Sequence, residues 1–317
     1  MGAALALAER GRALTVPNPN VGCVIVNRGR VVGRGWTQPG GRPHAEAMAL
    51  AEAGEKSRGA TVLTTLEPCA HTSPRGPACD GLLVAAGVAR VVIALVDPDP
   101  RTDGCGIARL RAGGIDVITG VRAAEARRAM AGFLTRLALG RPHVTLKLAM
   151  TLDGAVAMAD GTSRWLTGPE ARAHAHLERA RHEAILVGRG TIEADDPALD
   201  VRLAGLEGRS PRRLVLSRGG SVAGWASLQD PAGIATLDGV DHLLVEGGVQ
   251  TAAAFLAEDL VDRLLLYRAP ILIGGGRVLP DINLRDLSTA HGRWRHHDSR
   301  QLGSDGLEVY ERVRETH

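Results

Sequence analysis

The residues best suited to chemistry are one histidine and two cysteines in the first third of the chain. His44 lies in Pro-His-Ala-Glu, Cys69 ends Leu-Glu-Pro-Cys, and Cys79 follows ten residues later. A catalytic zinc site needs three protein ligands and one open position for water, and an imidazole with two thiolates meets that need. We therefore expect His44, Cys69 and Cys79 to bind one catalytic zinc ion.

Glu46 stands two residues after the expected histidine ligand. Its carboxylate can reach a water on the metal and shuttle its proton, while zinc makes that water a hydroxide near neutral pH. We expect His44 and Cys69 to open helices, whose positive ends favour hydroxide and thiolate. The alternative is a chance set of structural residues, and we favour metal catalysis by roughly ten to one. His-x-Glu followed by Pro-Cys is the signature of zinc nucleobase deaminases.

Other polar residues of the first half are weaker candidates. His71 and Arg75 lie between the two cysteines, where a long loop can contact a substrate phosphate. Asn20 precedes a predicted strand, and its amide either hydrogen-bonds a pyrimidine edge or forms a turn. We interpret Cys23 as a core residue and Cys105 as a loop thiol.

The elements that must position these residues alternate between strands and helices. The strand patterns cover residues 21–27, 31–36, 61–66, 90–96, 115–119, 143–150, 184–188, 213–217, 242–246, 263–272 and 306–312. The helical patterns cover residues 44–53, 79–86, 107–112, 123–139, 168–181 and 250–258, after an amphipathic start of the chain. This alternation predicts layered α/β domains, and Gly140-Arg141-Pro142 places their boundary, giving domains 1–141 and 142–317.

Composition excludes several classes of protein. Only 3% of the 317 residues are aromatic, which argues against stacking platforms for single-stranded nucleic acid. Residues 1–141 carry 18 basic and 11 acidic side chains, but the arginines are scattered, so we expect a small phosphorylated molecule and no nucleic acid. No apolar run is long enough to span a membrane, and four cysteines are too few for a disulfide scaffold. We expect a cytoplasmic homo-oligomer that binds no membrane.

The second half offers glycine clusters at the ends of predicted strands. Gly188-Arg189-Gly190 and Glu246-Gly247-Gly248 each follow an apolar strand, and Gly274-Gly275-Gly276 is a third cluster. Glycines between a strand and a helix let phosphate approach backbone N–H groups, although by themselves these fit ordinary turns better. Lys147, on the first strand of this half, either acts on a sugar or is a solvated lysine.

Longer segments resemble a known family. PNPNVGCVIV, PHAEAMAL and TLEPCAH with PACDGLL resemble the deaminase domain of the bifunctional riboflavin-biosynthesis deaminase–reductases. LKLAMTLDGAVA, SRWLTGPEAR, AILVGRGTIEADDPALDVR and LLVEGGVQTAAAFL resemble its reductase domain. The resemblance implies a cytidine-deaminase-like three-layer α/β/α domain followed by a dihydrofolate-reductase-like α/β domain. It also implies deamination of a phosphorylated ribosylaminopyrimidine and then reduction of its ribosyl group to ribityl with NADPH.

The resemblance also implies roles for individual residues. The zinc ligands and Glu46 keep the roles given above, and Lys147 would polarise or protonate the opened sugar. The residues implied around the ribosyl phosphate are Ser163, Arg179, Leu199, Arg202 and Glu246. The residues implied around NADPH are Ala149, Trp165, Thr191, Asp195, Ser217, Gly248, Val249, Gln250 and Thr251. Arg179 and Arg202 suit phosphate because a guanidinium binds it through two N–H groups.

This chain departs from the family pattern in two places. The family often places its two cysteines one residue closer, and residues 219–238 match it poorly.

Two other functions compete with this interpretation. A deaminase of nucleic acid, such as one acting on tRNA, predicts a basic and aromatic face beside the zinc. A zinc-stabilised binding protein predicts four protein ligands, whereas only three are apparent.

Overall fold

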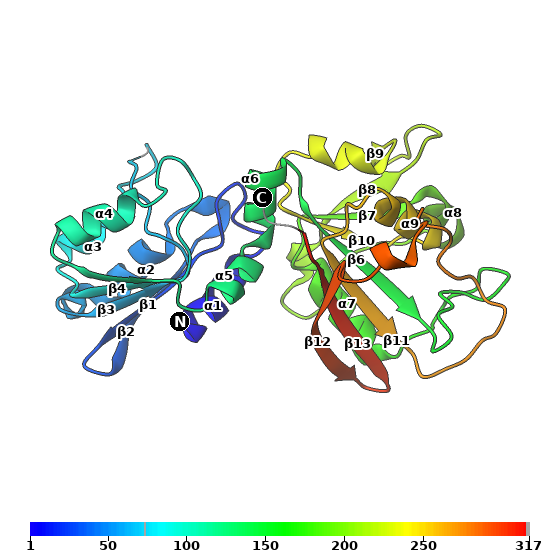
Figure 1. Ribbon diagram of the computed structural model, residues 1–317, viewed down its shortest axis with the longest axis horizontal. Helices are drawn as coiled ribbons and strands as arrows, with labels where there is room; N and C mark the ends of the chain where they lie inside the picture. The colour runs from blue at the N-terminus through cyan, green and yellow to red at the C-terminus, as the bar shows by residue number, and fades with distance from the viewer. Residues whose placement is uncertain (73, 315–317) are drawn as a thin grey trace. The chain divides into compact units, whose positions relative to one another are not determined.

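The computed structural model describes residues 1–72 and 74–314 of the chain (Figure 1). It divides the chain into two compact units, Met1–Leu139 and Gly140–His317. The division lies two residues before the boundary that the sequence predicts. Among the described residues, no helix is long and apolar enough to cross a membrane.

The first unit is built on a five-stranded sheet with the strand order β2-β1-β3-β4-β5. Its strands are β1 (Gly22–Asn27), β2 (Arg30–Trp36), β3 (Thr61–Thr64), β4 (Arg90–Ile93) and β5 (Asp116–Thr119). Its helices are α1 (Gly2–Ala8), α2 (Ala45–Ala53), α3 (Cys79–Ala85), α4 (Cys105–Ala112), α5 (Ala123–Ala129) and α6 (Ala131–Leu139). β1 pairs antiparallel with β2 and β3, whereas β3, β4 and β5 run parallel.

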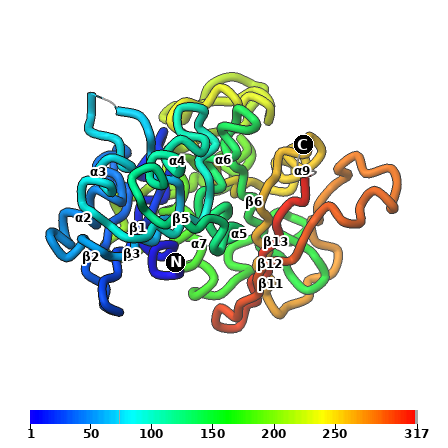
Figure 2. The backbone as a smooth tube through the Cα atoms, turned by 60° about the vertical axis from the view of Figure 1, so that its left-hand side comes forward, coloured from blue at the N-terminus to red at the C-terminus, as the bar shows by residue number. Residues whose placement is uncertain are grey.

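Helices cover both faces of this sheet, and small residues let them lie close. A Cβ on Gly22 of β1 would lie 1.9 Å from the Ala4 carbonyl oxygen in α1. Gly35 of β2 pairs with the next residue of β1, so it faces the other side, where a Cβ would lie 2.0 Å from the Ala45 carbonyl oxygen in α2. Because side chains alternate across a strand, α1 and α2 lie on opposite faces. Figures 1 and 2 both show α3 and α4 side by side. The predicted three-layer α/β/α arrangement is confirmed.

The second unit is built on an eight-stranded mixed sheet with the order β12-β13-β11-β6-β10-β7-β8-β9. Its strands are β6 (His143–Met150), β7 (Ala184–Gly188), β8 (Arg212–Leu216), β9 (Ala226–Leu228), β10 (His242–Val245), β11 (Arg263–Arg268), β12 (Trp294–Leu302) and β13 (Asp305–Arg312). Its helices are α7 (Pro169–Arg179), α8 (Arg189–Asp195) and α9 (Val249–Ala257). The strands from β11 to β9 run parallel, and β13 and β12 add an antiparallel edge.

Apolar side chains of the second unit form a core on each face of its sheet. Phe255 of α9 packs with Leu146 and Leu186 in the largest cluster. Ala171 of α7 packs on the opposite face with Leu265 and Tyr267, which lie next to each other on that face of β11. The carboxyl ends of β6, β10, β7 and β8 therefore meet at one edge between two helical layers, which is where α/β proteins bind ligands.

Some elements differ from the sequence-based predictions. The predicted helix over 123–139 is divided into α5 and α6 at Met130, which leaves helical geometry while its side chain is fully buried in the core. The predicted strand over 263–272 ends at Arg268, two residues before Pro270, which has no N–H for a ladder. Cys105 begins α4 and does not lie in a loop. β12 was not predicted, because its mostly exposed residues show no apolar alternation.

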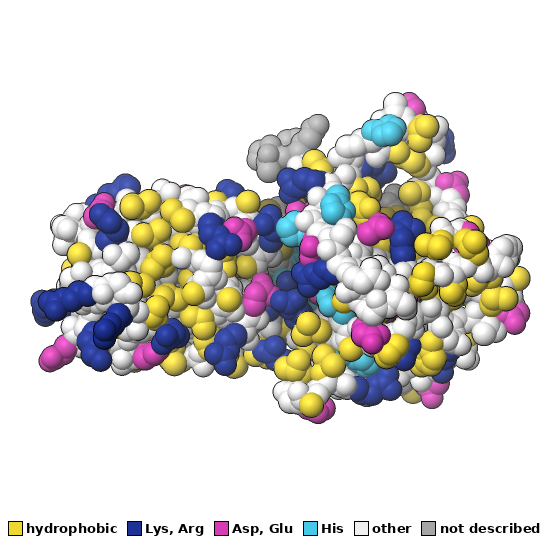
Figure 3. Space-filling view, turned by 90° about the horizontal axis from the view of Figure 1, so that it is seen from below, with side chains coloured by type: hydrophobic (Ala, Val, Ile, Leu, Met, Phe, Trp, Pro, Cys, Tyr) yellow, Lys and Arg dark blue, Asp and Glu magenta, His cyan; other side chains and the backbone are white. Residues whose placement is uncertain are grey.

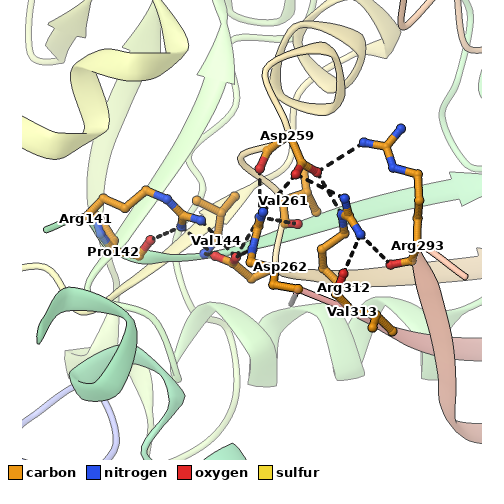
Figure 4. A network of polar contacts seen from close by, with 10 residues as sticks. Arg141, Pro142, Val144, Asp259, Val261, Asp262, Arg293, Arg312 and Val313 are labelled. Carbon is orange, nitrogen blue, oxygen red and sulfur yellow. Dashed lines mark hydrogen bonds and ion pairs between the residues drawn. The ribbon is translucent and has the colours of Figure 1, made fainter. Parts of the chain in front are cut away.

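A buried ion-pair network ties the first residues of the second unit to its sheet (Figure 4). Arg141 donates two hydrogen bonds to Asp262, at 2.7 and 3.0 Å, and each side chain is only 9% exposed. Asp262 also accepts from the Val144 backbone N–H and from Arg314. Asp259 beside it accepts from the guanidinium of Arg312. The network joins the segment before β6 to the end of β13.

This network predicts a stability effect. Asp262→Ala leaves the buried Arg141 charge uncompensated, so we expect the second unit to lose about 3–5 kcal/mol of unfolding free energy. The control is Asp298→Ala, which removes an exposed pair with Arg300 and should cost less than about 1 kcal/mol. Urea unfolding followed by tryptophan fluorescence measures both, and equal losses would contradict this interpretation.

Candidate functional site

The three predicted metal ligands come from three neighbouring segments of the first unit. His44 is the residue immediately before α2, and Cys79 is the first residue of α3. Cys69 lies in the loop after β3 and does not open a helix, so that part of the prediction was wrong. The backbone N–H of Cys79, at the start of α3, instead donates to the Cys69 sulfur at 3.4 Å. The start of α3 thus supplies one ligand and supports the other.

The ligand atoms lie at distances that fit a zinc ion. His44 Nδ1 is 3.5 Å from Cys69 Sγ and 3.4 Å from Cys79 Sγ, and the three atoms lie within 4.8 Å of one another. Zinc bonds of usual length at tetrahedral angles put nitrogen and sulfur ligands about 3.6 Å apart. The Asn18 amide group lies 3.5 Å from His44 Nε2, on the other edge of the ring, and such partners orient a ligand.

The protonation of these groups suits metal binding. The hydrogen bond from the Cys79 thiol, assisted by His44, lowers the pKa of Cys69 to about 3 although burial opposes it. That same hydrogen bond and burial raise the pKa of Cys79. Because cysteines bind metals as thiolates, the lowered pKa of Cys69 suits metal binding, and Cys79 would lose its proton on binding.

Glu46 lies at the base of a cavity of about 240 Å³ beside these ligands. It is on the first turn of α2, only 3% exposed, and its Oε1 is 3.1 Å from the Thr64 hydroxyl. Burial raises the pKa of Glu46, which favours a carboxyl group that can hold a proton and release it. Leu66, Val21 and Phe133 contribute apolar lining, which suits a planar ring.

The other predicted residues of the first unit are placed differently from one another. His71 lines the cavity, and its phosphate contact stays a prediction. Arg75 does not line it, and its guanidinium donates to the Gly40 carbonyl at 2.7 Å, so its phosphate contact stays a prediction. Asn20 is 4% exposed, and its amide N–H groups donate to the carbonyls of Ala8 and Ala129. These hydrogen bonds give Asn20 a role in the scaffold, and its pyrimidine contact stays a prediction.

Sequence reasoning missed several polar residues of the cavity wall. These residues are Asn18, Glu67, Asp97, Asp99, Arg101 and Arg136. Asp97 and Asp99 lie in the Asp-Pro-Asp-Pro run after β4, a turn-forming pattern that could have been recognised at the end of a strand. Burial raises the pKa of Asp97 to about 6, whereas the hydrogen bond from Arg101 lowers the pKa of Asp99 to about 2. On the face drawn in Figure 3, arginines of this unit are scattered among apolar side chains.

In the second unit, Glu246 brings two predicted residues together. Arg179, the last residue of α7, donates to both Glu246 carboxylate oxygens at 2.9 Å, and Lys147 Nζ of β6 lies 4.0 Å from Glu246. Burial opposes ionisation of Glu246, but the hydrogen bonds and charge of Arg179 outweigh it and lower its pKa. Two N–H groups of Arg179 are thus engaged by a carboxylate, and its contact with the ribosyl phosphate stays a prediction. Lys147 also lies 5.7 Å from the Tyr267 ring centre.

The remaining predicted substrate residues lie along the segment after α8. Arg179 also donates to the Asp200 carbonyl, and Leu199 beside it is 5% exposed. The backbone N–H of Arg202 lies 3.3 Å from His176 Nδ1, while its guanidinium is 64% exposed beside Asp200. Leu199 and Arg202 therefore gather near Arg179. The Ser163 carbonyl accepts from the Leu166 backbone N–H, and its substrate contact stays a prediction.

The predicted NADPH residues gather around α8 at the carboxyl edge of the sheet. Arg164, which precedes Trp165, donates to the Asp195 carbonyl at 2.7 Å, and Trp165 is 66% exposed. Arg189 at the start of α8 donates to the Ser217 hydroxyl at 2.8 Å. Thr191 lies in α8 and Ala149 in β6. Segments distant in sequence thus meet at one edge.

The start of α9 fits a phosphate-bearing cofactor. Gly248 precedes α9 without a side-chain cap, so the N–H groups of Val249, Gln250 and Thr251 lack partners within the helix. A Cβ on Gly188 would lie 2.4 Å from Thr251 Oγ1, and one on Gly247 would lie 2.5 Å from Thr251 Cβ. A side chain at either position would displace Thr251, so these glycines let Thr251 of α9 lie close to the ends of β7 and β10. A glycine that only forms a turn does not need Thr251 so close to its Cα atom.

Comparison with known families matches each unit separately. Residues 1–95 match the cytidine and deoxycytidylate deaminase zinc-binding region. Residues 142–307 match the RibD C-terminal domain, which is just over half of the chain.

Similar proteins cover both units together. The riboflavin biosynthesis protein RibD of Escherichia coli is 41% identical over 322 aligned residues, which cover 86% of this chain and 88% of that protein. Its counterpart from Aquifex aeolicus is 37% identical and covers 90% of each. Among solved structures, Acinetobacter baumannii RibD is 35% identical with a TM-score of 0.87, covering 99% of this chain and 98% of that one. A deaminase/reductase from Thermotoga maritima is 32% identical with a TM-score of 0.89, covering 99% and 97%.

The metal site predicts a selective effect of cysteine replacement. We expect the protein purified with zinc to hold one ion per chain. Cys79→Ser should lower the zinc affinity by more than about 100-fold, which exceeds the effect of removing a residue that only hydrogen-bonds a ligand. Cys105→Ser is the matched control, because that thiol is exposed and lies outside the site. Metal analysis after dialysis against a chelator measures both. Equal zinc retention by the two variants would exclude Cys79 as a ligand.

Proposed function

Because this chain belongs to the RibD family of riboflavin-biosynthesis proteins, we propose that each unit catalyses one of two consecutive reactions. The first is deamination of 2,5-diamino-6-ribosylamino-4(3H)-pyrimidinone 5′-phosphate. The second is NADPH-dependent reduction of the ribosyl side chain, giving 5-amino-6-ribitylamino-uracil 5′-phosphate. The observation that carries the proposal is the convergence of His44, Cys69 and Cys79 beside a cavity that His44, Cys69 and the buried Glu46 line.

In the first unit, His44, Cys69 and Cys79 hold zinc, and Glu46 moves the proton. Bound zinc supplies the acidity that makes water a nucleophile near neutral pH. Glu46 would accept a proton from that water as its oxygen bonds to the amino-bearing carbon, and would return the proton to the amino group, which leaves as ammonia when the C–N bond breaks. The raised pKa of Glu46 supports this role, because a carboxyl group must be able to hold the proton between the two transfers.

The wall of the cavity supplies contacts for the rest of the substrate. The apolar lining, which includes Phe133, contacts the pyrimidine ring. His71 and Arg101 face the cavity with hydrogen-bond donors, and we assign them to the phosphate. Arg75, in the same loop as His71, is a further phosphate candidate.

In the second unit, Lys147 acts on the opened sugar. Opening of the ribosylamine ring leaves a C1′=N bond, and reduction adds a hydride to C1′ and a proton to nitrogen. NADPH supplies the hydride. Lys147 is the charged donor beside Glu246, which holds it in place, while Arg179 keeps Glu246 ionised. Arg202, with its exposed guanidinium, binds the phosphate, and Leu199 and Ser163 complete the substrate contacts.

The carboxyl edge of the second sheet holds NADPH. The N–H groups of Val249, Gln250 and Thr251 at the start of α9, after Gly248, suit its pyrophosphate. The other residues assigned to NADPH are Ala149, Trp165, Thr191, Asp195 and Ser217. We also propose a cytoplasmic location, which rests on the low cysteine content, and a homo-oligomeric state, which is the common form of such enzymes.

Glu46→Gln tests the deaminase mechanism. The amide cannot accept and return a proton, so ammonia release should fall by at least about 10²–10⁴-fold. Zinc should stay at one ion per chain, because Glu46 is not a ligand, and reduction of the deaminated intermediate supplied directly should be unchanged. Ammonia release at the rate of the unmodified enzyme would falsify the role of Glu46.

Lys147→Met tests the reductase mechanism. We expect NADPH oxidation with the deaminated intermediate to fall by about 10²–10⁴-fold, while ammonia release from the first substrate is unchanged. Lys56→Met is the matched control, because Lys56 is the other lysine of the chain and is exposed in the first unit. If Lys147→Met oxidises NADPH as fast as Lys56→Met, then Lys147 is only a solvated residue of β6.

A further inference from the structure

We propose that Glu67 is a positioning residue of the deaminase site, which holds the 97–104 segment against the cavity. Neither the zinc site nor the proton transfer uses Glu67, although it lies two residues before the ligand Cys69 and lines the cavity. The proposal rests on the proposed deaminase function. It gives a task to a carboxylate that is only 2% exposed.

Three backbone N–H groups, from Asp97, Gly104 and Ile107, donate to Glu67. Its Oε2 accepts from Asp97 at 3.2 Å and from Gly104 at 3.0 Å. Its Oε1 accepts from Ile107, in the first turn of α4, at 3.0 Å. The Glu67 backbone N–H in turn donates to the Leu95 carbonyl at 2.8 Å. One side chain thus fixes both ends of the 97–104 segment to the loop that carries a zinc ligand.

Within the 97–104 segment, two aspartates continue the series of hydrogen bonds that starts at Glu67. Each aspartate accepts a hydrogen bond from the residue two positions later. Asp97 Oδ1 accepts from the Asp99 backbone N–H at 3.0 Å. Asp99 Oδ1 accepts from the backbone N–H and the Nε of Arg101, at 3.0 and 2.9 Å. Asp97, Asp99 and Arg101 all line the cavity. Because the series starts at Glu67, loss of its hydrogen bonds displaces the residues that face the substrate.

The surroundings of Glu67 leave little room for another arrangement. A Cβ on Gly106 of α4 would lie 2.2 Å from the Pro68 carbonyl oxygen and 3.1 Å from Glu67 Oε1. α4 therefore packs directly against the Glu67–Pro68 backbone. A carboxylate has enough lone pairs on its two oxygens to accept all three N–H groups. A glutamine of the same shape presents one oxygen and turns an NH2 group toward at least one of these donors.

Glu67→Gln in the full-length protein tests the proposal. We expect zinc to remain at one ion per chain and the deaminase KM to rise about tenfold with a smaller change in kcat, because a wall of the substrate cavity moves while the reacting groups stay. Amide hydrogen exchange should become faster within residues 97–107 and stay unchanged within α3. Glu52→Gln, which alters an exposed partner of Arg34, should leave every measurement unchanged.

Two kinds of result for a folded variant overturn the proposal. Unchanged KM and unchanged exchange within 97–107 would show that Glu67 positions nothing. Loss of zinc, or an equal loss in kcat and kcat/KM, would show a general scaffold role. If Glu67→Gln does not fold, Glu67→Asp repeats the test, since it keeps both oxygens but withdraws them by one methylene. Absence of ammonia release by the unmodified protein would refute the proposed function instead, and the exchange measurement would still decide the role of Glu67.

Discussion

The meeting of one imidazole nitrogen and two thiol sulfurs is the constraint on which the first unit depends. His44 can reach the thiols only because α2 lies close to the sheet, where Gly35 leaves no side chain between them. Cys79 reaches the same point because α3 begins there, and its N–H group supports the Cys69 sulfur. Gly35 therefore positions His44 at the metal site and also lets α2 pack on the core.

The second unit depends on one buried carboxylate instead of a metal. Burial of Glu246 would cost several kcal/mol if it were unpaired. Arg179 compensates this charge through two hydrogen bonds. Lys147 of the neighbouring strand β6 lies 4.0 Å from the same carboxylate. The pairing engages two N–H groups of Arg179 and keeps a negative charge beside Lys147.

The metal site could be predicted from the sequence because residue type and spacing follow from the ligand chemistry. The strands could be predicted equally well where they are buried, as in β6 and β7, whereas exposed β12 has no apolar pattern. Side-chain direction in loops could not be predicted. The neighbours Asn18 and Asn20 are equally polar, yet Asn18 faces the cavity and Asn20 donates to backbone carbonyls. Likewise, nothing in the sequence pairs Arg179 with Glu246 across 67 positions.

The central claim is that one chain carries out both reactions in order. The most direct test supplies the phosphorylated diaminopyrimidine to the zinc-loaded protein with NADPH, and follows ammonia release and NADPH oxidation in the same sample. The account predicts that both occur in equal molar amounts at completion, and that NADPH oxidation begins only after ammonia has been released. Ammonia release without NADPH oxidation, or oxidation before any ammonia appears, would contradict it.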